Sequence, residues 1–331
     1  MKNIGLVGMG LIGKTHLEAY HSIPTAKVTA ICSRKEWKNE LAPFFDGSFV
    51  TQYEALLSRD DIDIVDICVP TFLHEEYITK AAKAGKHIIC EKPLTLTEEA
   101  AERIIHVTEE CGVRLFVAHV LRFWPEYQTI KAYSEIDKLS NMETVHIGRL
   151  GQLPAWSEWF QHPEKSGGAL FDLHIHDIDF VYYLLGEVER VYAVGHQNQY
   201  GAWDHILTTL TFKDGAKAFV EGSQRMPNGY PFTMSLRAQT SKNALDFQLK
   251  AGENIEHIDG SQMIFYESGQ EPEIVDVEQA DAFQNELAYF VDCIENDREN
   301  AIIPLDDVLY IIKLLQSIEK SLETGREVQV M

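Results

Sequence analysis

The amino-acid sequence predicts an α/β protein in which a doubly wound parallel sheet is followed by a domain with an antiparallel sheet. In the first part of the chain, strand-like and helix-like segments alternate, which is typical of βαβ units. Beyond Arg122, several runs alternate between apolar and polar residues, and Asp214-Gly215 separates two of them with a hairpin turn signal. At 331 residues, the chain is long enough for two domains. We expect the first to span residues 1–121 and the second residues 122–331.

The first domain is expected to contain short apolar strands separated by amphipathic helices. Gly85 and Gly112 each follow a helical segment, at the position where glycine commonly ends a helix. The segment Thr95–Glu98 fits a capping box, which marks the start of another helix. The predicted strands are Lys2–Val7, Lys27–Cys32, Ile64–Val69, His87–Cys90 and Arg114–Ala118. The predicted helices are Leu11–His21, Tyr53–Leu57, Leu73–Ala84 and Glu98–Glu110.

The second domain is expected to carry an antiparallel sheet with helices on one face. An amphipathic stretch at Glu126–Ile136 leads to a strand at Thr144–Arg149. A polar and aromatic loop follows, and then a helix from about Gly168 to Leu185. Further strands are predicted at His205–Phe212, Ala216–Gly222, Phe232–Gln239, Ala244–Leu249, Gln262–Glu267 and Glu273–Val277. The last two helices are predicted at Ala280–Asn296 and Leu305–Thr324.

Charge and composition exclude several classes of partner. The net charge of −22 disfavours nucleic acid and anionic membranes, which both attract basic surfaces. Neither a secretory signal nor a membrane-spanning segment is expected, because the chain enters a strand at once and no apolar run is long enough. An odd number of cysteines without close pairs indicates free thiols in a reducing cytoplasm. These cysteines are Cys32, Cys68, Cys90, Cys111 and Cys293.

A glycine-rich segment follows the first strand and opens the first helix. Gly8 permits a tight turn, Gly10 lets the backbone approach a pyrophosphate, and Gly13 allows the helix to pack closely on the strand. The motif is weak evidence alone, because glycines often serve only as turns, but its place between strand and helix favours dinucleotide binding. The segment expected to contact the dinucleotide comprises Gly8, Gly10, Leu11, Ile12 and Gly13.

The residues after the second strand are expected to contact the adenosine ribose. Ser33 lies twenty positions after Gly13, where an acidic residue would bind the ribose hydroxyl and repel a phosphate. Ser33, Arg34 and Lys35 instead offer a hydroxyl and two cations, which favours NADP(H) over NAD(H). The alternative is that Arg34 and Lys35 belong to a solvated loop.

Lys92 lies in Glu91-Lys92-Pro93, directly after the strand His87–Cys90. The carboxyl ends of strands in an open parallel sheet are where ligands bind. A lysine that is partly desolvated there has a tunable proton affinity and three donors for a substrate oxygen. A dinucleotide loop and a strand-end lysine together suggest hydride chemistry on a nicotinamide, although Lys92 could also be an ordinary exposed lysine.

Asp172 and His176 form a second candidate constellation. On a helix, residues four apart share a face, so the carboxylate can orient the imidazole and raise its basicity. Such a pair can also do no more than satisfy buried polar groups. A metal site at His174, His176 and Asp177 is not expected, because neighbouring helix positions diverge and no further cluster completes the ligand set.

The chain resembles the glucose–fructose oxidoreductase and inositol dehydrogenase family (Gfo/Idh/MocA) over essentially its whole length. The order and spacing of several motifs carry the resemblance. These motifs are Gly8–Gly13, Val69-Pro70-Thr71 with His74, Glu91-Lys92-Pro93, Gly168-Ala169-Leu170 leading to Asp172, His176-Asp177-Ile178-Asp179, and Gly186. The resemblance implies a Rossmann domain, a C-terminal α+β domain with a large, open, mostly antiparallel sheet, and NAD(P) as cofactor.

The resemblance also implies Lys92, Asp172 and His176 as the catalytic trio, and adds Pro70, Thr71, His74, Glu91 and Lys92 to the residues near the cofactor. This chain departs from the family at two positions. Ser33 stands where many members carry an acid, which puts a preference for NAD in doubt, and Thr71 stands where asparagine is frequent.

These features predict an NAD(P)-dependent dehydrogenase or reductase acting on a sugar, a polyol or an oxidised derivative. His176 would accept the hydroxyl proton, Asp172 would orient His176, and Lys92 would stabilise charge on the reacting oxygen. The same three side chains, Lys92, Asp172 and His176, are expected to bind the substrate. Arg122, Trp156 and Trp159 are further candidates for substrate contacts, although both tryptophans could equally belong to a core or an interface.

Two other functions fit the sequence. A hydrolase could use the cofactor transiently, oxidising and re-reducing a sugar while a glycosidic bond breaks, and its turnover would consume no cofactor. A dinucleotide-binding sensor could regulate a partner, but a sensor has no need of the acid/base set. The family resemblance and the predicted sheet indicate a homodimer or homotetramer, and no nucleic-acid or membrane partner is expected.

Overall fold

The computed structural model describes residues 1–35, 37, 41, 43–153, 159, 162–252 and 258–330. The chain forms two compact units. The first combines Met1–Phe123 with Ala280–Ile312, and the second combines Trp124–Gln279 with Lys313–Met331. The division expected from the sequence, residues 1–121 and 122–331, stays a prediction about independently folding domains.

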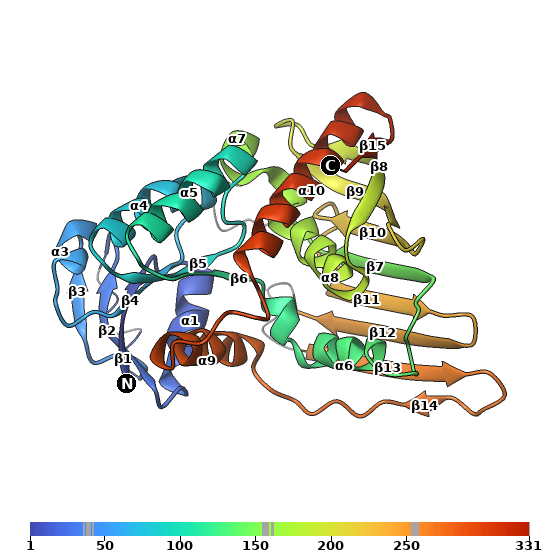
Figure 1. The fold of residues 1–331 in the computed structure, drawn as a ribbon, viewed down its shortest axis with the longest axis horizontal. Coiled ribbons are helices and arrows are strands. Elements are labelled where there is room, and N and C mark those ends of the chain that lie inside the picture. Colours follow the sequence, from blue (N-terminus) through green and yellow to red (C-terminus); the bar gives the residue numbers. More distant parts are fainter. Residues whose placement is uncertain are drawn as a thin grey trace. The chain divides into compact units, whose positions relative to one another are not determined.

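The first unit contains a six-stranded sheet in the order β3-β2-β1-β4-β5-β6, and its described strands all pair in parallel (Figure 1). The predicted doubly wound architecture is therefore confirmed. The order reverses direction between β1 and β4, which is the switch point at which such sheets bind ligands. The strands are β1 (Lys2–Val7), β2 (Ala26–Cys32), β3 (Ser48–Val50), β4 (Ile64–Ile67), β5 (His87–Glu91) and β6 (Leu115–Ala118).

Helices cover both faces of this sheet, which explains why its strands are almost wholly apolar. The helix α9 (Ala282–Glu295) packs beside α1, although it comes from far along the chain. The guanidinium of Arg114 donates hydrogen bonds to the carbonyls of Cys293 and Arg298, and thereby connects the start of β6 to this late segment. The other helices are α1 (Leu11–His21), α3 (Tyr53–Leu57), α4 (His74–Lys83) and α5 (Glu98–Glu110), with the short 3-10 helices η1 (Thr71–Leu73) and η2 (Val120–Phe123).

The second unit contains a nine-stranded sheet in the order β14-β13-β12-β11-β7-β10-β9-β8-β15. Its strands β7 and β10 pair in parallel, and the other described neighbours pair antiparallel, which confirms a mostly antiparallel sheet. The strands are β7 (Thr144–Leu150), β8 (Val188–Gln197), β9 (Trp203–Phe212), β10 (Lys217–Ser223), β11 (Phe232–Gln239), β12 (Asn243–Ala251), β13 (Ile258–Glu267), β14 (Glu273–Ile274) and β15 (Val328–Gln329).

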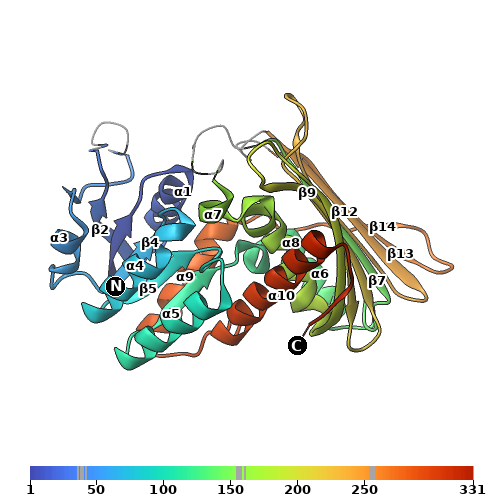
Figure 2. The same cartoon turned by 90° about the horizontal axis from the view of Figure 1, so that it is seen from above.

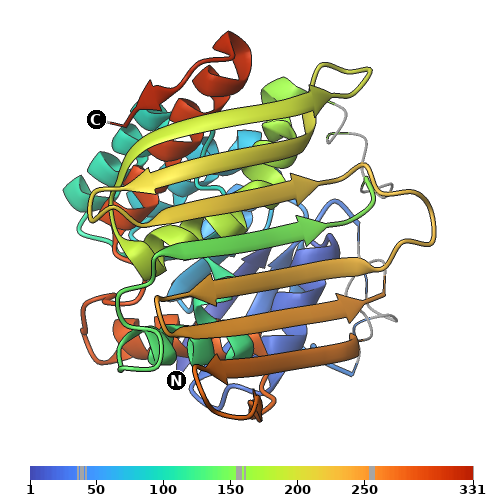
Figure 3. The same ribbon diagram turned by 90° about the vertical axis from the view of Figure 1, so that its right-hand side faces the viewer.

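One face of this sheet is buried and the other is open. Figure 2 shows the sheet nearly edge-on, with α6 (Pro125–Ser134) and α8 (Ile175–Leu185) on one side, and Figure 3 looks onto the opposite face. Along β9, Ile206 and Leu210 are fully buried, whereas Leu207 is 46% exposed. This alternation follows from the two-residue period of a strand. The remaining helices are α7 (Pro163–Ser166) and α10 (Leu305–Thr324), which begins in the first unit and ends in the second.

The structure corrects the sequence prediction in two places. The strand β8 was not predicted, because a register shift between Val188 and Arg190 interrupts the alternation of buried and exposed residues. The predicted helix from Gly168 begins instead with a π-helical turn at Leu170–His174.

None of the helices in the described part of the chain has the length and apolar composition needed to span a membrane.

A buried ion pair fixes α8 to the sheet. The guanidinium of Arg149 on β7 donates from Nη2 and Nε to the two carboxylate oxygens of Asp177, at 3.0 and 3.1 Å. The side chains are 4% and 0% exposed. Burial raises the pKa of Asp177 despite the attraction of Arg149, so the pair depends on both partners being present.

Asp177→Ala should lower the free energy of unfolding by about 3–5 kcal/mol, because Arg149 would remain buried without its counter-charge. The double change Arg149→Met with Asp177→Leu should restore most of this loss, because it removes both charges and keeps apolar volume. Urea unfolding followed by circular dichroism measures both effects. An equal loss in the two variants would contradict the ion-pair explanation.

Candidate active site

The glycine-rich segment lies at the switch point of the parallel sheet. Val7 and Ile67 are register partners at the ends of β1 and β4, and the amide of Cys68 donates to the carbonyl of Val7 at 2.8 Å. Gly8 therefore leaves β1 directly beside the residue that follows β4. The carboxyl ends of these two strands flank the start of α1.

Close backbone packing explains two of the three glycines. Gly8 has a φ of +93°, and a Cβ at this position would lie 2.4 Å from the carbonyl oxygen of Cys68. A Cβ on Gly13 would lie 2.1 Å from the carbonyl oxygen of Gly8. A Cβ on Gly10, by contrast, would meet no atom within 4 Å. Gly8 and Gly13 are thus needed by the fold, whereas Gly10 borders open space.

The N-terminus of α1 suits an anion. Within the described residues, no side chain caps this helix end at Gly10, and its first turn, which contains Leu11 and Ile12, carries no acid. Free N–H groups and the positive end of the helix dipole therefore face the space beside Gly10. Such an end can bind the pyrophosphate of a dinucleotide, and the contact of these residues with a cofactor stays a prediction.

The predicted ribose-binding segment contains a tryptophan that sequence reasoning missed. The Nε1 of Trp37 donates to the hydroxyl of Ser33 at 3.1 Å. The ammonium groups of Lys14 and Lys35 lie 4.2 and 3.4 Å from the centre of the Trp37 ring. Two lysines therefore lie over the Trp37 ring, and Arg34, next to Ser33 in the chain, is exposed. The contact between Lys14 and Trp37 spans more than twenty residues and leaves no local sequence signal.

His74 connects the loops that follow β4 and β5. Its Nε2 lies 2.9 Å from the carbonyl oxygen of Val69, and its Nδ1 lies 2.9 Å from that of Pro93. Burial lowers the pKa of His74, so the ring is neutral and donates from one nitrogen at a time. Pro70 and Thr71, also predicted near the cofactor, form the turn between Val69 and this histidine. These contacts give His74 a structural role beside any cofactor contact.

Lys92 follows β5 and is partly exposed between the buried residues Glu91 and Pro93. The Lys92–Pro93 peptide bond is cis. The backbone N–H of Lys92 donates to Oε2 of the Glu91 side chain at 3.0 Å. Lys92 therefore lies at the carboxyl end of β5, as predicted, and the buried carboxylate of Glu91 binds its backbone N–H.

Asp172 and His176 are the accessible residues of an otherwise buried segment in the second unit. In the described stretch from Gly168 to Val181, these two residues are partly exposed and all the others are buried. Asp172 lies in the π-helical turn and His176 in the first turn of α8, so a spacing of four residues keeps them on one face. The segment thus presents one carboxylate and one imidazole.

Gln224 is a residue of this site that the sequence did not indicate. It is 6% exposed, follows β10, and donates from Nε2 to Oδ2 of Asp172 at 2.9 Å. His174, two residues from His176, is fully buried and contacts the hydroxyl of Thr208 at 2.9 Å. Burial lowers the pKa of His174 to about 3, so it stays neutral. His174 is therefore enclosed in the protein, whereas His176, two residues later, is partly exposed.

The other predicted substrate contacts are Arg122, Trp156 and Trp159. The side chain of Arg122 is fully buried, and its Nη1 donates to Asp307 at 2.7 Å and to the carbonyl of Ile302 at 2.6 Å. This burial favours a structural role for Arg122 over the predicted substrate contact. Trp159 is half-buried in the segment before α7. The prediction for Trp156 lies outside the described residues.

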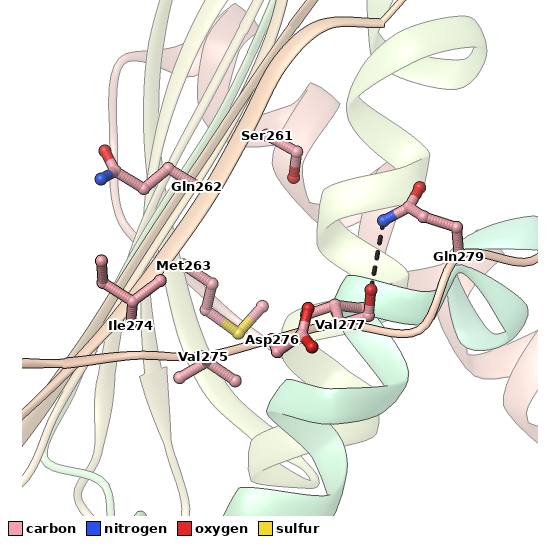
Figure 4. A pocket seen from close by; sticks show the side chains of 8 residues that line it. All are labelled: Ser261, Gln262, Met263, Ile274, Val275, Asp276, Val277 and Gln279. Carbon is pink, nitrogen blue, oxygen red and sulfur yellow. Dashed lines mark hydrogen bonds between the residues drawn. The ribbon is translucent and has the colours of Figure 1, made fainter.

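A pocket of the second unit lies along β13 and the segment after β14 (Figure 4). Asp276 is the ionisable residue in its lining, and no predicted site residue contributes to it. The side-chain amide of Gln279 donates from Nε2 to the backbone carbonyl of Val277 at 3.3 Å, at one end of the pocket. We assign no catalytic role to this pocket.

Gly10→Ala should leave the melting temperature nearly unchanged but weaken NADH and NADPH binding by at least about tenfold, because the methyl group enters the open space beside α1. Gly13→Ala should instead lower the melting temperature, since its Cβ collides with the Gly8 carbonyl. Thermal unfolding and cofactor fluorescence titration separate the two effects. Unchanged cofactor affinity in Gly10→Ala would contradict the assignment of this space to the dinucleotide.

Comparisons with known proteins agree with these features. Residues 2–119 match an oxidoreductase family with an NAD-binding Rossmann fold. Residues 127–245 match the Gfo/Idh/MocA C-terminal domain. The two matches cover one stretch in each of the two compact units.

Individual relatives span much of the chain. Inositol 2-dehydrogenase of Rhizobium meliloti is 27% identical over a 340-residue alignment that covers 98% of both proteins. A 2,7-anhydro-N-acetylneuraminate hydratase of Escherichia coli is 30% identical over 234 residues, covering 67% of this chain and 61% of the relative. The structure of levoglucosan dehydrogenase with NADH and L-sorbose shares the fold, with a TM-score of 0.85, 23% identity, and coverage of 100% and 99%. The protein is a member of the Gfo/Idh/MocA family of NAD-binding oxidoreductases.

Proposed function

We propose that the protein is an NAD(P)-dependent dehydrogenase or reductase that acts on a sugar, a polyol or an oxidised derivative of one. The observation that carries this proposal is the exposure of Asp172 and His176 alone within the buried stretch from Gly168 to Val181. A burial pattern that leaves an acid/base pair accessible is what proton transfer to a bound substrate requires. The inositol dehydrogenase relative supports a polyhydroxylated substrate.

Each proposed catalytic residue has a separate task. In the oxidative direction, His176 accepts the proton of the substrate hydroxyl, and Asp172 orients and stabilises the imidazolium. The bond from Gln224 holds one carboxylate oxygen of Asp172 in place. Lys92 donates a hydrogen bond to the reacting oxygen and stabilises its developing negative charge. The nicotinamide, when bound, supplies the hydride acceptor.

A second reaction class is favoured by one relative. The 2,7-anhydro-N-acetylneuraminate hydratase is named for a reaction without net oxidation. A family member that oxidises and re-reduces its substrate within one cycle would use the same Lys92, Asp172 and His176. Product formation without a net change in cofactor absorbance distinguishes this cycle from a dehydrogenase.

Lys92→Ala should lower kcat by two or more orders of magnitude while NAD(P)H still binds, because it removes stabilisation of the transition state. The assay follows cofactor absorbance with a panel of sugars and polyols that includes myo-inositol. Lys83→Ala, which removes an exposed lysine of the same unit, is the control and should keep its rate. Near-normal turnover in Lys92→Ala would refute the catalytic assignment.

We propose that the protein prefers NADP(H) to NAD(H). The support is the pair of lysines, Lys14 and Lys35, over the ring of Trp37, which in turn binds the hydroxyl of Ser33. Arg34 follows Ser33 in the chain and is exposed. Such donors suit a 2′-phosphate, and the carboxylate that would repel it is missing from the position of Ser33.

NADPH should therefore bind at least about tenfold more tightly than NADH, since a charge-assisted hydrogen bond is worth about 1.5–3 kcal/mol. Ser33→Asp combined with Arg34→Ala should reverse the order, because the new carboxylate binds a free ribose and repels the phosphate. Lys83→Ala, which removes one positive charge elsewhere, should not. Tighter NADH binding in the unmodified protein, measured by fluorescence titration, would show that the cations do not select the cofactor.

We also propose a cytoplasmic homo-oligomer. The cysteines are free thiols in the structure, which fits a reducing compartment. The open face of the nine-stranded sheet carries four large apolar side chains on three neighbouring strands, and they are 42–46% exposed. These are Tyr192, Val194, Leu207 and Phe219. An apolar patch on an uncovered sheet face suits contact with a second copy.

Light scattering at micromolar concentration should give at least twice the mass of one chain. Leu207→Glu combined with Phe219→Glu should reduce the mass to that of a single chain, because it places charges within the apolar patch. A monomeric mass for the unmodified protein would contradict the proposed association. An unchanged oligomer in the double variant would locate the interface elsewhere.

A further inference from the structure

Three ionisable side chains form a buried chain of hydrogen bonds in the first unit. His16 on α1 is fully buried, and its Nδ1 lies 2.8 Å from Oδ2 of Asp66 on β4. Its Nε2 lies 3.2 Å from Oε1 of Glu91, the last residue of β5. One imidazole therefore joins a helix to two neighbouring strands beneath their carboxyl ends.

The chain of bonds ends at the proposed catalytic lysine. The second carboxylate oxygen of Glu91, Oε2, accepts the hydrogen bond from the backbone N–H of Lys92. Glu91 thus has one oxygen on His16 and the other on Lys92. The orientation of this carboxylate, and through it the backbone that carries the ammonium group of Lys92, depends on His16.

Charge strengthens the connection. Burial disfavours the charged imidazole, but Cys68 and Asp66 outweigh burial and hold the pKa of His16 well above its usual range. Burial raises the pKa of Cys68 to about 12, which favours its thiol form. Burial raises the pKa of Glu91, but its hydrogen bond to His16 outweighs this effect and leaves the pKa below its usual value. With a proton on each ring nitrogen, His16 can donate to Asp66 and to Glu91 at the same time.

A neighbouring acid, Glu286, is also buried in the first unit. Glu286 on α9 is fully buried. Burial first, and then the nearby Glu91, raise the pKa of Glu286 well above its usual range. Both effects favour the uncharged form of Glu286.

The same cluster is poorly arranged for a metal ion. His16, Asp66 and Cys68 offer ligand atoms within 4.8 Å of one another. Ligands of a tetrahedral zinc ion lie roughly 3.3 Å apart, given bonds of about 2.0–2.1 Å to nitrogen and oxygen. The 2.8 Å separation of His16 Nδ1 and Asp66 Oδ2 is instead that of a direct hydrogen bond. The geometry therefore favours direct hydrogen bonds around the imidazole over a bound metal ion.

We infer that His16 and Asp66 are positioning residues that hold Glu91 and, through its bond to the Lys92 amide, fix the backbone from which Lys92 acts. This inference rests on the proposed catalytic role of Lys92. It gives the histidine one turn after the glycine-rich segment a task in the reaction rather than in cofactor binding. A displacement of a catalytic group by about 1 Å can lower a rate about a hundredfold.

The first test needs no substrate. In His16→Leu, hydrogen exchange of the Lys92 amide, followed by NMR or on peptides that contain it, should be about tenfold faster than in the unmodified protein. Leu17→Ala is the matched control, because Leu17 is a buried residue of the same helix outside the cluster. Equal exchange in the two variants would overturn the inference, since general loosening would then explain the effect.

The second test is a double-mutant cycle, with kcat measured on the best substrate of the sugar and polyol panel. His16→Leu should lower kcat about ten- to a hundredfold and change the NADPH dissociation constant less than about threefold. In the Lys92→Ala background, the same change should have no further effect, because its route to the reaction is already removed. A multiplicative loss in the double variant would overturn the inference.

Two further results keep the tests interpretable. If His16→Leu does not fold, Asp66→Asn carries both tests, because it keeps the side-chain volume and removes the charge that holds the imidazolium. If Lys92→Ala retains full turnover, the proposed function fails, whereas the exchange of the Lys92 amide still decides whether His16 holds this backbone.

Discussion

The first unit depends on the close approach of α1 to the ends of β1 and β4. Gly8 and Gly13 leave no room for a Cβ, and this contact places the first turn of the helix directly beyond the switch point of the sheet. The same approach buries His16, because it lies three residues after Gly13 and faces the sheet. Dinucleotide binding at the helix end and the buried bonds to Asp66 and Glu91 thus both depend on two glycines.

The second unit depends on burial in a different way. The segment from Gly168 to Val181 lies against the sheet, and its side chains are held by contacts such as the Arg149–Asp177 pair and the His174–Thr208 bond. Breaking the Arg149–Asp177 pair would cost several kcal/mol, so α8 cannot easily rotate about its axis. The exposure of Asp172 and His176 is therefore a consequence of how firmly their neighbours are buried.

The sequence predicted the fold class and the candidate residues where the signal is local. The alternation of strands and helices, the spacing of Gly8, Gly10 and Gly13, and the four-residue spacing of Asp172 and His176 each follow from short-range geometry. Gln224 and the His16–Glu91 bond could not be predicted, because their partners are far apart in the chain. The same holds for the contact between Lys14 and Trp37, whereas the bond from Trp37 to Ser33 is local. The strand β8 was not predicted, because its register shift disrupts the two-residue alternation of buried and exposed side chains by which a strand is recognised.

The membership of α9 in the first unit has a consequence for synthesis on the ribosome. Phe290 and Val291 belong to the apolar core that also contains Phe116 and Phe123. When residues 1–123 have emerged, roughly 170 more must be added before this helix is complete, which takes on the order of 10–35 s at typical elongation rates. During that interval Phe116 and Phe123 lack the contact with Phe290 that covers them in the folded protein. Chaperone binding to the nascent chain should therefore be concentrated in this window and should end when α9 docks.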